Sequence, residues 1–148
     1  AWSPFVSSAF LSCSADWAIK VWHQDSDTAM LTLQSSADYV GDLHWSPAIS
    51  TCFASVTGDG LVNIWDMSIS TLDPIVSEKR VHPETKATIV PWCIRFSPNA
   101  NVVVAGDNSG CVVVYKLSGV DSTKYSMKDQ IERLEKALAA KDNADETH

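Results

Sequence analysis

The residue types that carry acid–base, nucleophilic or metal chemistry are present in the 148-residue sequence, but not in the patterns that such chemistry needs. The histidines form no HExxH pair, the cysteines lack CxxC spacing, and no GxSxG or GxxxxGK[ST] motif occurs. We expect the cysteines to be buried free thiols within predicted strands. The sequence therefore predicts no catalytic residue, no metal ligand and no cofactor. The residues concerned are His23, His44, His82, His148, Cys13, Cys52, Cys93 and Cys111.

Two stretches that contain Gly and Asp, GDG at 58–60 and GDNSG at 106–110, are the remaining candidates, because such residues also build phosphate-binding loops. Each stretch lies between two runs of strand-forming residues, however, where an Asp-Gly pair is ordinary hairpin chemistry. An Asp side chain at such a turn accepts a hydrogen bond from the backbone two residues on. We therefore predict structural turns at Asp16, Asp59 and Ser109.

These turns belong to three hairpins that recur in register: FLSCSADWAIKVW at 10–22, CFASVTGDGLVNIW at 52–65 and VVVAGDNSGCVVVY at 102–115. An aromatic-Ser-Pro step precedes each hairpin, and an aromatic residue closes it. In the first two copies the turn Asp follows the first aromatic residue by 14 positions and precedes the closing one by 6. The six aromatic residues are Trp2, Trp22, Trp45, Trp65, Phe96 and Tyr115.

The repeat spacing, 43 and then 51 residues with four short strands in each copy, is typical of β-propeller blades. Trp65-Asp66 is the Trp-Asp pair that gives WD repeats their name. A β-sandwich with coincidentally similar hairpins is the alternative. We predict an all-β fold in which residues 1–119 form the last three blades of a partial WD-repeat β-propeller. Because a blade is stable only between neighbours, we expect further blades of the same chain before Ala1.

Strand patterning predicts where the individual strands of these blades lie. The inner strand at 40–45 is expected to alternate strictly between its two faces, with His44 bonded to a neighbouring strand. A weak outer strand is expected at 74–76, because Pro suits only an edge or a strand start, followed by an exposed loop at 77–88. The last strand, at 111–117, is apolar on both faces and is expected to be buried on both.

Residues 120–148 are expected to form an acidic tail with a short C-terminal helix at about 127–140 and disorder at 141–148. The apolar stripe of this helix consists of Met127, Ile131, Leu134 and Leu138. A helix of this length is marginal alone, so the stripe packs on its own propeller, docks on a partner chain, or frays. Truncation after Gly119 is expected to leave the blades folded.

Composition excludes two classes of partner. The net charge of −7 argues against a nucleic-acid surface. No apolar run approaches the roughly 20 residues of a membrane span. At 45% hydrophobic residues the chain as a whole is expected to fold.

Several stretches of the sequence resemble the C-terminal WD-repeat region of dynein intermediate chains. They are the first hairpin, ADYVGDLHWSP at 37–47 and FASVTGDGLVNIWDMSISTLDPI at 53–75. VVVAGDNSGCVVVYKL at 102–117 is similar to the last blade of that family. Within the family, STLDPI at 70–75 resembles an axonemal inner-arm chain of the arm called dynein f, whereas ADYV at 37–40 is also similar to the cytoplasmic chain.

This resemblance implies a non-catalytic scaffold subunit of an axonemal dynein that contributes to ciliary motility. The implied partners are the tail of a dynein heavy chain and other dynein intermediate and light chains. The implied location is the cytoplasm and the axoneme of a cilium or flagellum. A cytoplasmic dynein intermediate chain in cargo transport and a generic WD-repeat adaptor are the alternatives.

The sequence departs from the family pattern at two kinds of position. Common WD repeats carry a His about nine residues before the aromatic-Ser-Pro step, where this chain has Ser36 and Ala87. Asp16 and Asp59 must therefore be satisfied by the turn backbone or by water. Trp17 follows the first turn Asp, where most WD repeats place Gly or Lys; it either folds over its own blade or anchors an interface. Trp17 and the helix stripe are the candidate partner-binding residues.

Overall fold

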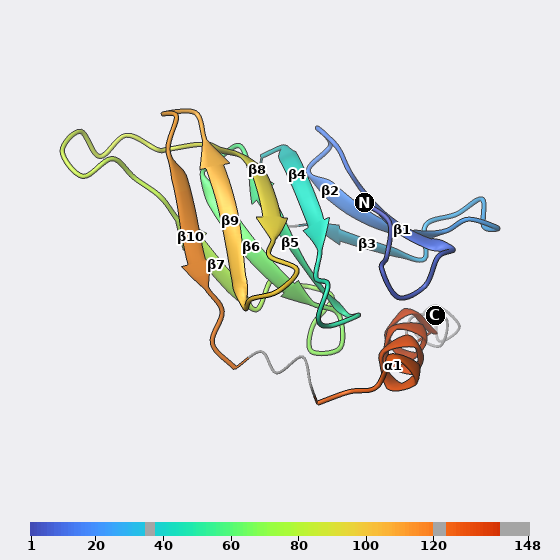
Figure 1. Ribbon diagram of the computed structural model, residues 1–148. Coiled ribbons are helices and arrows are strands. Elements are labelled where there is room, and N and C mark those ends of the chain that lie inside the picture. Colours follow the sequence, from blue (N-terminus) through green and yellow to red (C-terminus); the bar gives the residue numbers. More distant parts are fainter. Residues whose placement is uncertain (35–37, 120–123, 140–148) are drawn as a thin grey trace.

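The computed structural model describes residues 1–34, 38–119 and 124–139, which form three antiparallel sheets and one helix (Figure 1). We call the sheets blade 1 (β1-β2-β3), blade 2 (β4-β5-β6-β7) and blade 3 (β8-β9-β10). No helix among these residues is long and apolar enough to cross a membrane. The predicted disorder at 141–148 lies outside the described residues. The elements are β1 (Ala9–Cys13), β2 (Ala18–His23), β3 (Leu31–Gln34), β4 (Val40–Trp45), β5 (Cys52–Thr57), β6 (Leu61–Asp66), β7 (Val76–Lys79), β8 (Pro91–Phe96), β9 (Val102–Asp107), β10 (Val112–Lys116) and α1 (Met127–Ala139).

Each blade is built on one of the three predicted hairpins, and strand pairing keeps the aromatic positions in register. The paired residues are Phe10 with Trp22, Phe53 with Trp65, and Val103 with Tyr115. In blade 1 the indole N–H of Trp22 donates to Ser12 Oγ at 2.8 Å, and in blade 2 that of Trp65 donates to Ser55 Oγ at 3.1 Å. The first two blades therefore repeat side-chain contacts as well as backbone pairing.

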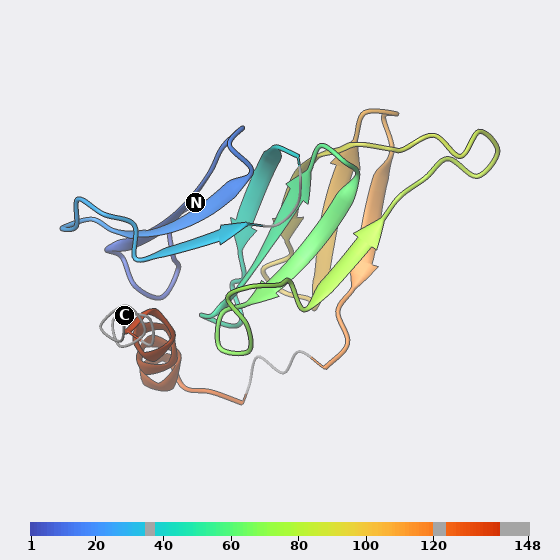
Figure 2. The ribbon, with the colours of Figure 1, turned by 180° about the vertical axis from the view of Figure 1, so that it is seen from behind.

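The blades stack face to face, with blade 2 between blades 1 and 3, as the views from both sides show (Figures 1 and 2). One face of blade 2 packs on blade 1 through Phe53 and Trp65, whose rings stack with centroids 5.7 Å apart. The opposite face packs on blade 3 through Ala54 and Val56. All six residues of β5 are buried in consequence. This arrangement confirms the prediction of a partial WD-repeat propeller followed by a C-terminal helix.

The inner strand β4 does not alternate strictly, contrary to the sequence prediction. The register of β4 against β5 shifts between Val40 and Asp42, which is the mark of a β-bulge at Gly41. The extra residue turns Val40 to the same core as Leu43 and Trp45. Even-numbered and odd-numbered residues of β4 therefore both contribute to the contact with blade 1.

The outer strand of blade 2 lies later in the sequence than predicted. Strand β7 begins at Val76, so the predicted strand at 74–76 and the predicted loop at 77–88 were each placed too early. Pro74 has no N–H to donate to the sheet, whereas Ser77 pairs with Asn63 and donates its hydroxyl to Asn63 Oδ1 at 2.6 Å.

Strand β10 is not buried on both faces, so that prediction was wrong. Val112 and Val114 are 68% and 61% exposed, while Tyr115 on the other face packs against the core shared with blade 2. Blade 3 is the last of the three stacked sheets, and none of the described residues covers its far face. Apolar residues on both sides of a strand indicate two covered faces only where a second layer is present.

Candidate interaction surfaces

The described residues hold no group of three or more His, Cys, Asp or Glu side chains placed to bind a metal ion. All four cysteines are free, but the prediction that they are buried holds only in part. Cys52 is buried, and burial raises the pKa of its thiol. Cys93, in β8, and Cys111, just before β10, are exposed. The candidate sites on the described residues are therefore surfaces that could contact a partner.

The hairpin turns of blades 1 and 2 use the predicted carboxylates. Asp16 Oδ1 accepts a hydrogen bond from the N–H of Ala18 at 3.2 Å, two residues on. Asp59 Oδ1 accepts one from the hydroxyl of Thr57 at 2.5 Å. The partner of Asp16 is the turn backbone, as expected in the absence of the family His, whereas that of Asp59 is a side chain of the same turn, which the expectation did not include.

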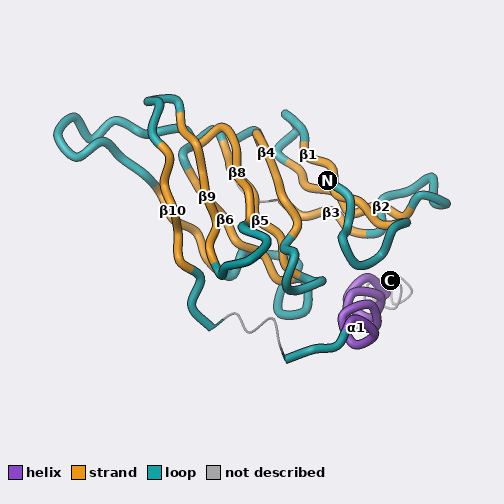
Figure 3. The backbone as a smooth tube through the Cα atoms, viewed as in Figure 1, coloured by secondary structure: helices purple, strands orange, loops and turns teal. Residues whose placement is uncertain are grey.

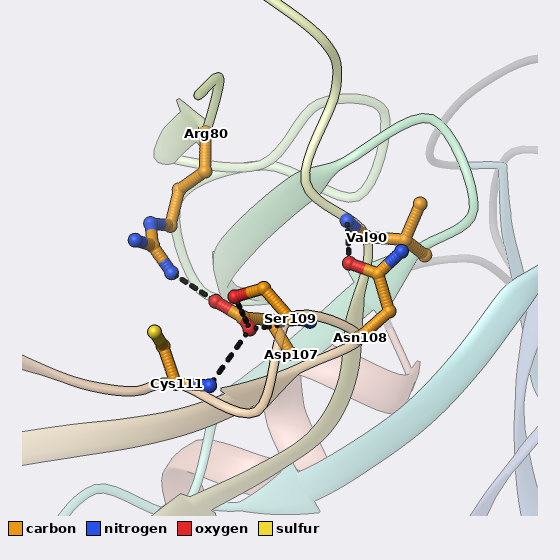
Figure 4. A network of polar contacts seen from close by, with 6 residues as sticks. All are labelled: Arg80, Val90, Asp107, Asn108, Ser109 and Cys111. Carbon is orange, nitrogen blue, oxygen red and sulfur yellow. Dashed lines mark hydrogen bonds and ion pairs between the residues drawn. The ribbon is translucent and has the colours of Figure 1, made fainter. Parts of the chain in front are cut away.

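In blade 3 Ser109 lies in the turn, at the predicted position, but Asp107 supplies the acceptor. Asp107 Oδ1 accepts from the N–H and the hydroxyl of Ser109, at 3.0 and 2.6 Å, and from the N–H of Cys111 at 3.1 Å (Figure 4). Blade 2 has Thr57 and Asp59 at the same two positions, so carboxylate and hydroxyl have exchanged places. The hydrogen bond from the Ser109 hydroxyl is the main cause that lowers the pKa of Asp107.

This exchange lets the blade 3 turn hold the connection between blades 2 and 3. The second oxygen of Asp107 forms an ion pair with Arg80, and Asn108 Oδ1 accepts from the N–H of Val90 at 3.1 Å (Figure 4). Arg80 and Val90 are the first and last residues of the loop between β7 and β8, a long loop that extends beyond the sheets (Figure 3). Within the loop, Val81 and Thr88 form an isolated β-bridge. The loop is therefore pinned at its base.

Side chains of β4 in blade 2 form hydrogen bonds and an ion pair with β8 in blade 3. Asp42 Oδ2 accepts from the N–H of Ile94 at 3.0 Å and pairs with Arg95 at 2.6 Å. His44 Nδ1 accepts from the N–H of Phe96 at 3.1 Å, which confirms the prediction of a strand histidine bonded to a neighbour. Burial, followed by the charge of Arg95, lowers the pKa of His44, so the imidazole is neutral and free to accept.

We expect the stability of the chain to fall as the pH drops below about 6.5, the ordinary pKa of His44. The pKa is lower in the folded than in the unfolded chain, so the unfolded chain binds the proton first and acid favours unfolding. Urea unfolding at pH 7.5 and pH 5.5 measures the loss. In His44→Asn, which keeps an acceptor near the Nδ1 position, the loss should shrink; the control His23→Asn should retain it. An unchanged pH dependence in His44→Asn would contradict the assignment.

Trp17 occupies a strained backbone position at the blade 1 turn. Its φ is 69°, and the corresponding residues of blades 2 and 3 are glycines, Gly60 with φ 89° and Gly110 with φ 83°. A residue with a side chain is disfavoured in this left-handed region by about 1–2 kcal/mol. The indole is 43% exposed and belongs to neither core cluster. Core packing therefore does not offset the strain at Trp17.

Helix α1 packs on its own propeller, which was one of the three predicted alternatives. It lies beneath blades 1 and 2, at the end of the sheets opposite the long loop (Figure 2). Gln130 is buried: its side chain accepts from the N–H of Ser50 at 2.9 Å and donates to the carbonyl of Ala48 at 2.9 Å. The backbone carbonyl of Gln130 accepts a hydrogen bond from the Ser50 hydroxyl at 2.5 Å. The helix is thus joined to the β4–β5 loop.

The apolar stripe of α1 divides into a buried and an exposed part. Leu134 and Leu138 are buried in the core shared by blades 1 and 2, so they are not available to a partner chain. Met127 is 60% exposed and Ile131 is partly exposed. The expectation that the blades fold independently of the tail is therefore revised, because the helix completes their core.

The six hairpin aromatics also fall into distinct environments. Trp45 and Trp65 are buried between blades 1 and 2, and Phe96 and Tyr115 pack partly buried between blades 2 and 3. The third pair, Trp2 and Trp22, contacts Phe10 on the open face of blade 1. Sequence reasoning missed Asp107 and Gln130. The Gly-Asp pair at 106–107 is a sequence signal that could have identified Asp107 as a turn residue, whereas no sequence signal marks Gln130.

The three stacked antiparallel sheets, with an aromatic residue closing each hairpin, define a segment of a WD-repeat β-propeller. The family model for the WD domain, G-beta repeat, matches residues 77–116, which extend from β7 to β10. This chain is 38% identical over 131 residues to dynein axonemal intermediate chain 4 of Danio rerio, covering 88% of this chain and 16% of that protein.

Two further relatives are also dynein intermediate chains. The Homo sapiens dynein axonemal intermediate chain 4 is 34% identical over 142 residues, or 96% of this chain and 16% of the relative. The ciliary dynein intermediate chain 2 of Heliocidaris crassispina is 40% identical over 119 residues, or 79% of this chain and 16% of the relative. The resemblance to dynein intermediate chains that the hairpins predicted is confirmed, and the chain spans about one sixth of the length of these relatives.

Proposed function

We propose that this chain is a non-catalytic scaffold segment of an axonemal dynein complex, located in the axoneme of a cilium or flagellum and contributing to ciliary motility. The observation that carries the proposal is the similarity to axonemal and ciliary intermediate chains over 79–96% of the chain. The finer assignment to the inner arm called dynein f rests on the likeness of residues 70–75 and is part of the same proposal.

Rigid stacking supports a scaffold role. Two hydrophobic cores and the inner-edge contacts of Asp42 and His44 hold the three blades in one arrangement. A rigid body with several exposed edges keeps its partners in fixed relation without moving parts. We propose that these partners are the tail of a dynein heavy chain and other intermediate and light chains. The open apolar faces of blades 1 and 3 are the surfaces on which further blades of the same polypeptide would pack.

Trp17 is the proposed anchor for a partner subunit. Exposed tryptophans are enriched at interaction hot spots, and backbone strain that core packing does not offset is typical of functional positions. The exposed part of the helix stripe, Met127 with Ile131, is a second proposed contact. Leu134 and Leu138 support it only by holding the helix in place.

Trp17→Gly is expected to leave the chain as stable as before or more stable by up to about 1.5 kcal/mol, and to weaken partner binding. Relief of the left-handed strain, about 1–2 kcal/mol, outweighs the added freedom of Gly in the unfolded chain, about 0.5–1 kcal/mol. Urea unfolding measures the first effect and recovery of heavy chain from ciliary extract the second. Lost stability with unchanged recovery would reassign Trp17 to the fold.

The function itself is tested by purification of the tagged protein from a salt extract of axonemes. We expect dynein heavy chain and other intermediate and light chains to be recovered with it. A generic WD-repeat adaptor would instead recover a ubiquitin or chromatin assembly without heavy chain. Recovery of cytoplasmic rather than axonemal heavy chain would assign the protein to cargo transport.

A further inference from the structure

A pocket of about 350 Å³ lies where α1 meets the loop that follows β6. From the loop it is lined by Met67, Ser68 and Thr71, and from the helix by Arg133, Lys136 and Ala137. Arg133 and Lys136 are three positions apart in α1 and therefore share one side of the helix. Two cations thus line a single pocket in a chain whose net charge is −7.

Arg133 is held in place by contacts that do not neutralise it. Its guanidinium lies over the ring of Tyr125, with the Cζ atom 3.9 Å from the ring centroid, and Nη2 donates to Ser68 Oγ at 3.3 Å. Nη1 is buried and makes no hydrogen bond to the described residues. None of the acidic side chains in the described ranges forms an ion pair with it. A buried guanidinium nitrogen without a hydrogen-bond acceptor or counter-charge is unfavourable, so an anion beside Nη1 of Arg133 would be stabilising.

The carboxylate of Asp66, the last residue of β6 before this loop, is already engaged. Asp66 Oδ1 accepts hydrogen bonds from the hydroxyls of Thr51 and Ser68, at 2.7 and 2.6 Å, and from the N–H of Ser68 at 2.9 Å. These bonds fix Ser68, which in turn fixes Arg133. The loop therefore positions the guanidinium for an external partner instead of pairing with it.

We propose that this pocket is an oxyanion site that binds a phosphate or carboxylate group on a peptide segment of a partner protein. A fixed, planar guanidinium can donate to two oxygens of either group, and Lys136 adds a second positive charge. Thr71, which bears a hydroxyl, lines the same pocket, whereas the hydroxyl of Ser68 already donates to Asp66. Ile69 and Leu72 in the same loop are 71% and 79% exposed, and they offer apolar contact to residues that flank the anionic group. The proposal does not depend on the dynein assignment.

The test is an NMR titration of the ¹⁵N-labelled chain with inorganic phosphate, and separately with acetate as the carboxylate probe, at constant ionic strength. We expect saturable shifts confined to the amides of residues 67–72 and 133–137. Lys136→Gln should weaken phosphate binding about 3- to 10-fold, and Arg133→Lys should weaken it further because the fork is lost. Saturation by phosphate alone, or by both probes, distinguishes a phosphorylated ligand from a carboxylate ligand.

Lys128→Gln is the matched control, because it removes the same charge from α1 outside the pocket lining. It should change the affinity for phosphate by less than about twofold, as expected for a screened surface charge. The amide signals of residues outside the pocket report whether each variant retains the fold. Linear shifts without saturation, or equal weakening by Lys128→Gln and Lys136→Gln in folded protein, would overturn the proposal.

Discussion

Replacing Leu134 with alanine is expected to lower the free energy of unfolding by about 2–5 kcal/mol, the range typical of a fully buried leucine. Leu134 lies in the core cluster that also contains Leu33 of blade 1 and Trp65 of blade 2. Its loss would leave a cavity where the helix joins both blades. Urea unfolding of the 148-residue chain measures the change, with the midpoint and the slope compared for each variant.

Met127→Ala is the matched control for this result, because it shortens another apolar side chain of the same helix. Met127 is 60% exposed, so its truncation should change stability by less than about 0.5 kcal/mol. Equal losses in the two variants would mean that α1 is not docked in this way. Truncation after Gly119 removes Gln130 as well as Leu134 and should destabilise the blades more than Leu134→Ala does.

Trp65→Ala is expected to destabilise the chain by about 3–5 kcal/mol, and Trp22→Ala by at least about 1.5 kcal/mol less. The two residues occupy the same place in successive hairpins, and each indole donates to a serine hydroxyl. They differ in burial. Trp65 is fully buried between blades 1 and 2, whereas Trp22 is partly exposed on the open face of blade 1. The comparison therefore measures what a neighbouring blade contributes.

The same pair tests the proposal of further blades. In a longer polypeptide that supplies a blade against the open face, Trp22→Ala should destabilise as strongly as Trp65→Ala. If the two variants are already equal in the 148-residue chain, the face-to-face stacking of the blades would be in error.

Local pattern predicted the three hairpins and the helix of this fold. The spacing of Asp16 and Asp59 from their flanking aromatics predicted two hairpins in the register that the structure has. The helical stripe predicted α1, whose first residue is Met127 in both the prediction and the structure. These features depend on residues close together in the chain, where alternation and turn chemistry dominate.

Features that depend on distant neighbours could not be predicted in the same way. The exposure of Val112 and Val114 follows from the absence of a covering layer among the described residues, which the strand's own pattern does not encode. Burial of Gln130 requires the β4–β5 loop, some eighty residues away in sequence, to supply its hydrogen-bond partners. The contact of Arg80 with Asp107 likewise exists only once blades 2 and 3 are stacked.

The most direct test of the account is to locate the protein in the axoneme. Cryo-electron tomography of cilia that carry the protein with a density-forming tag would compare the averaged dynein arms with those of untagged cilia. The account predicts additional density within a dynein arm, next to the heavy-chain tails. Unchanged arms, in cilia where the tagged protein is present and the tag density lies elsewhere, would contradict it.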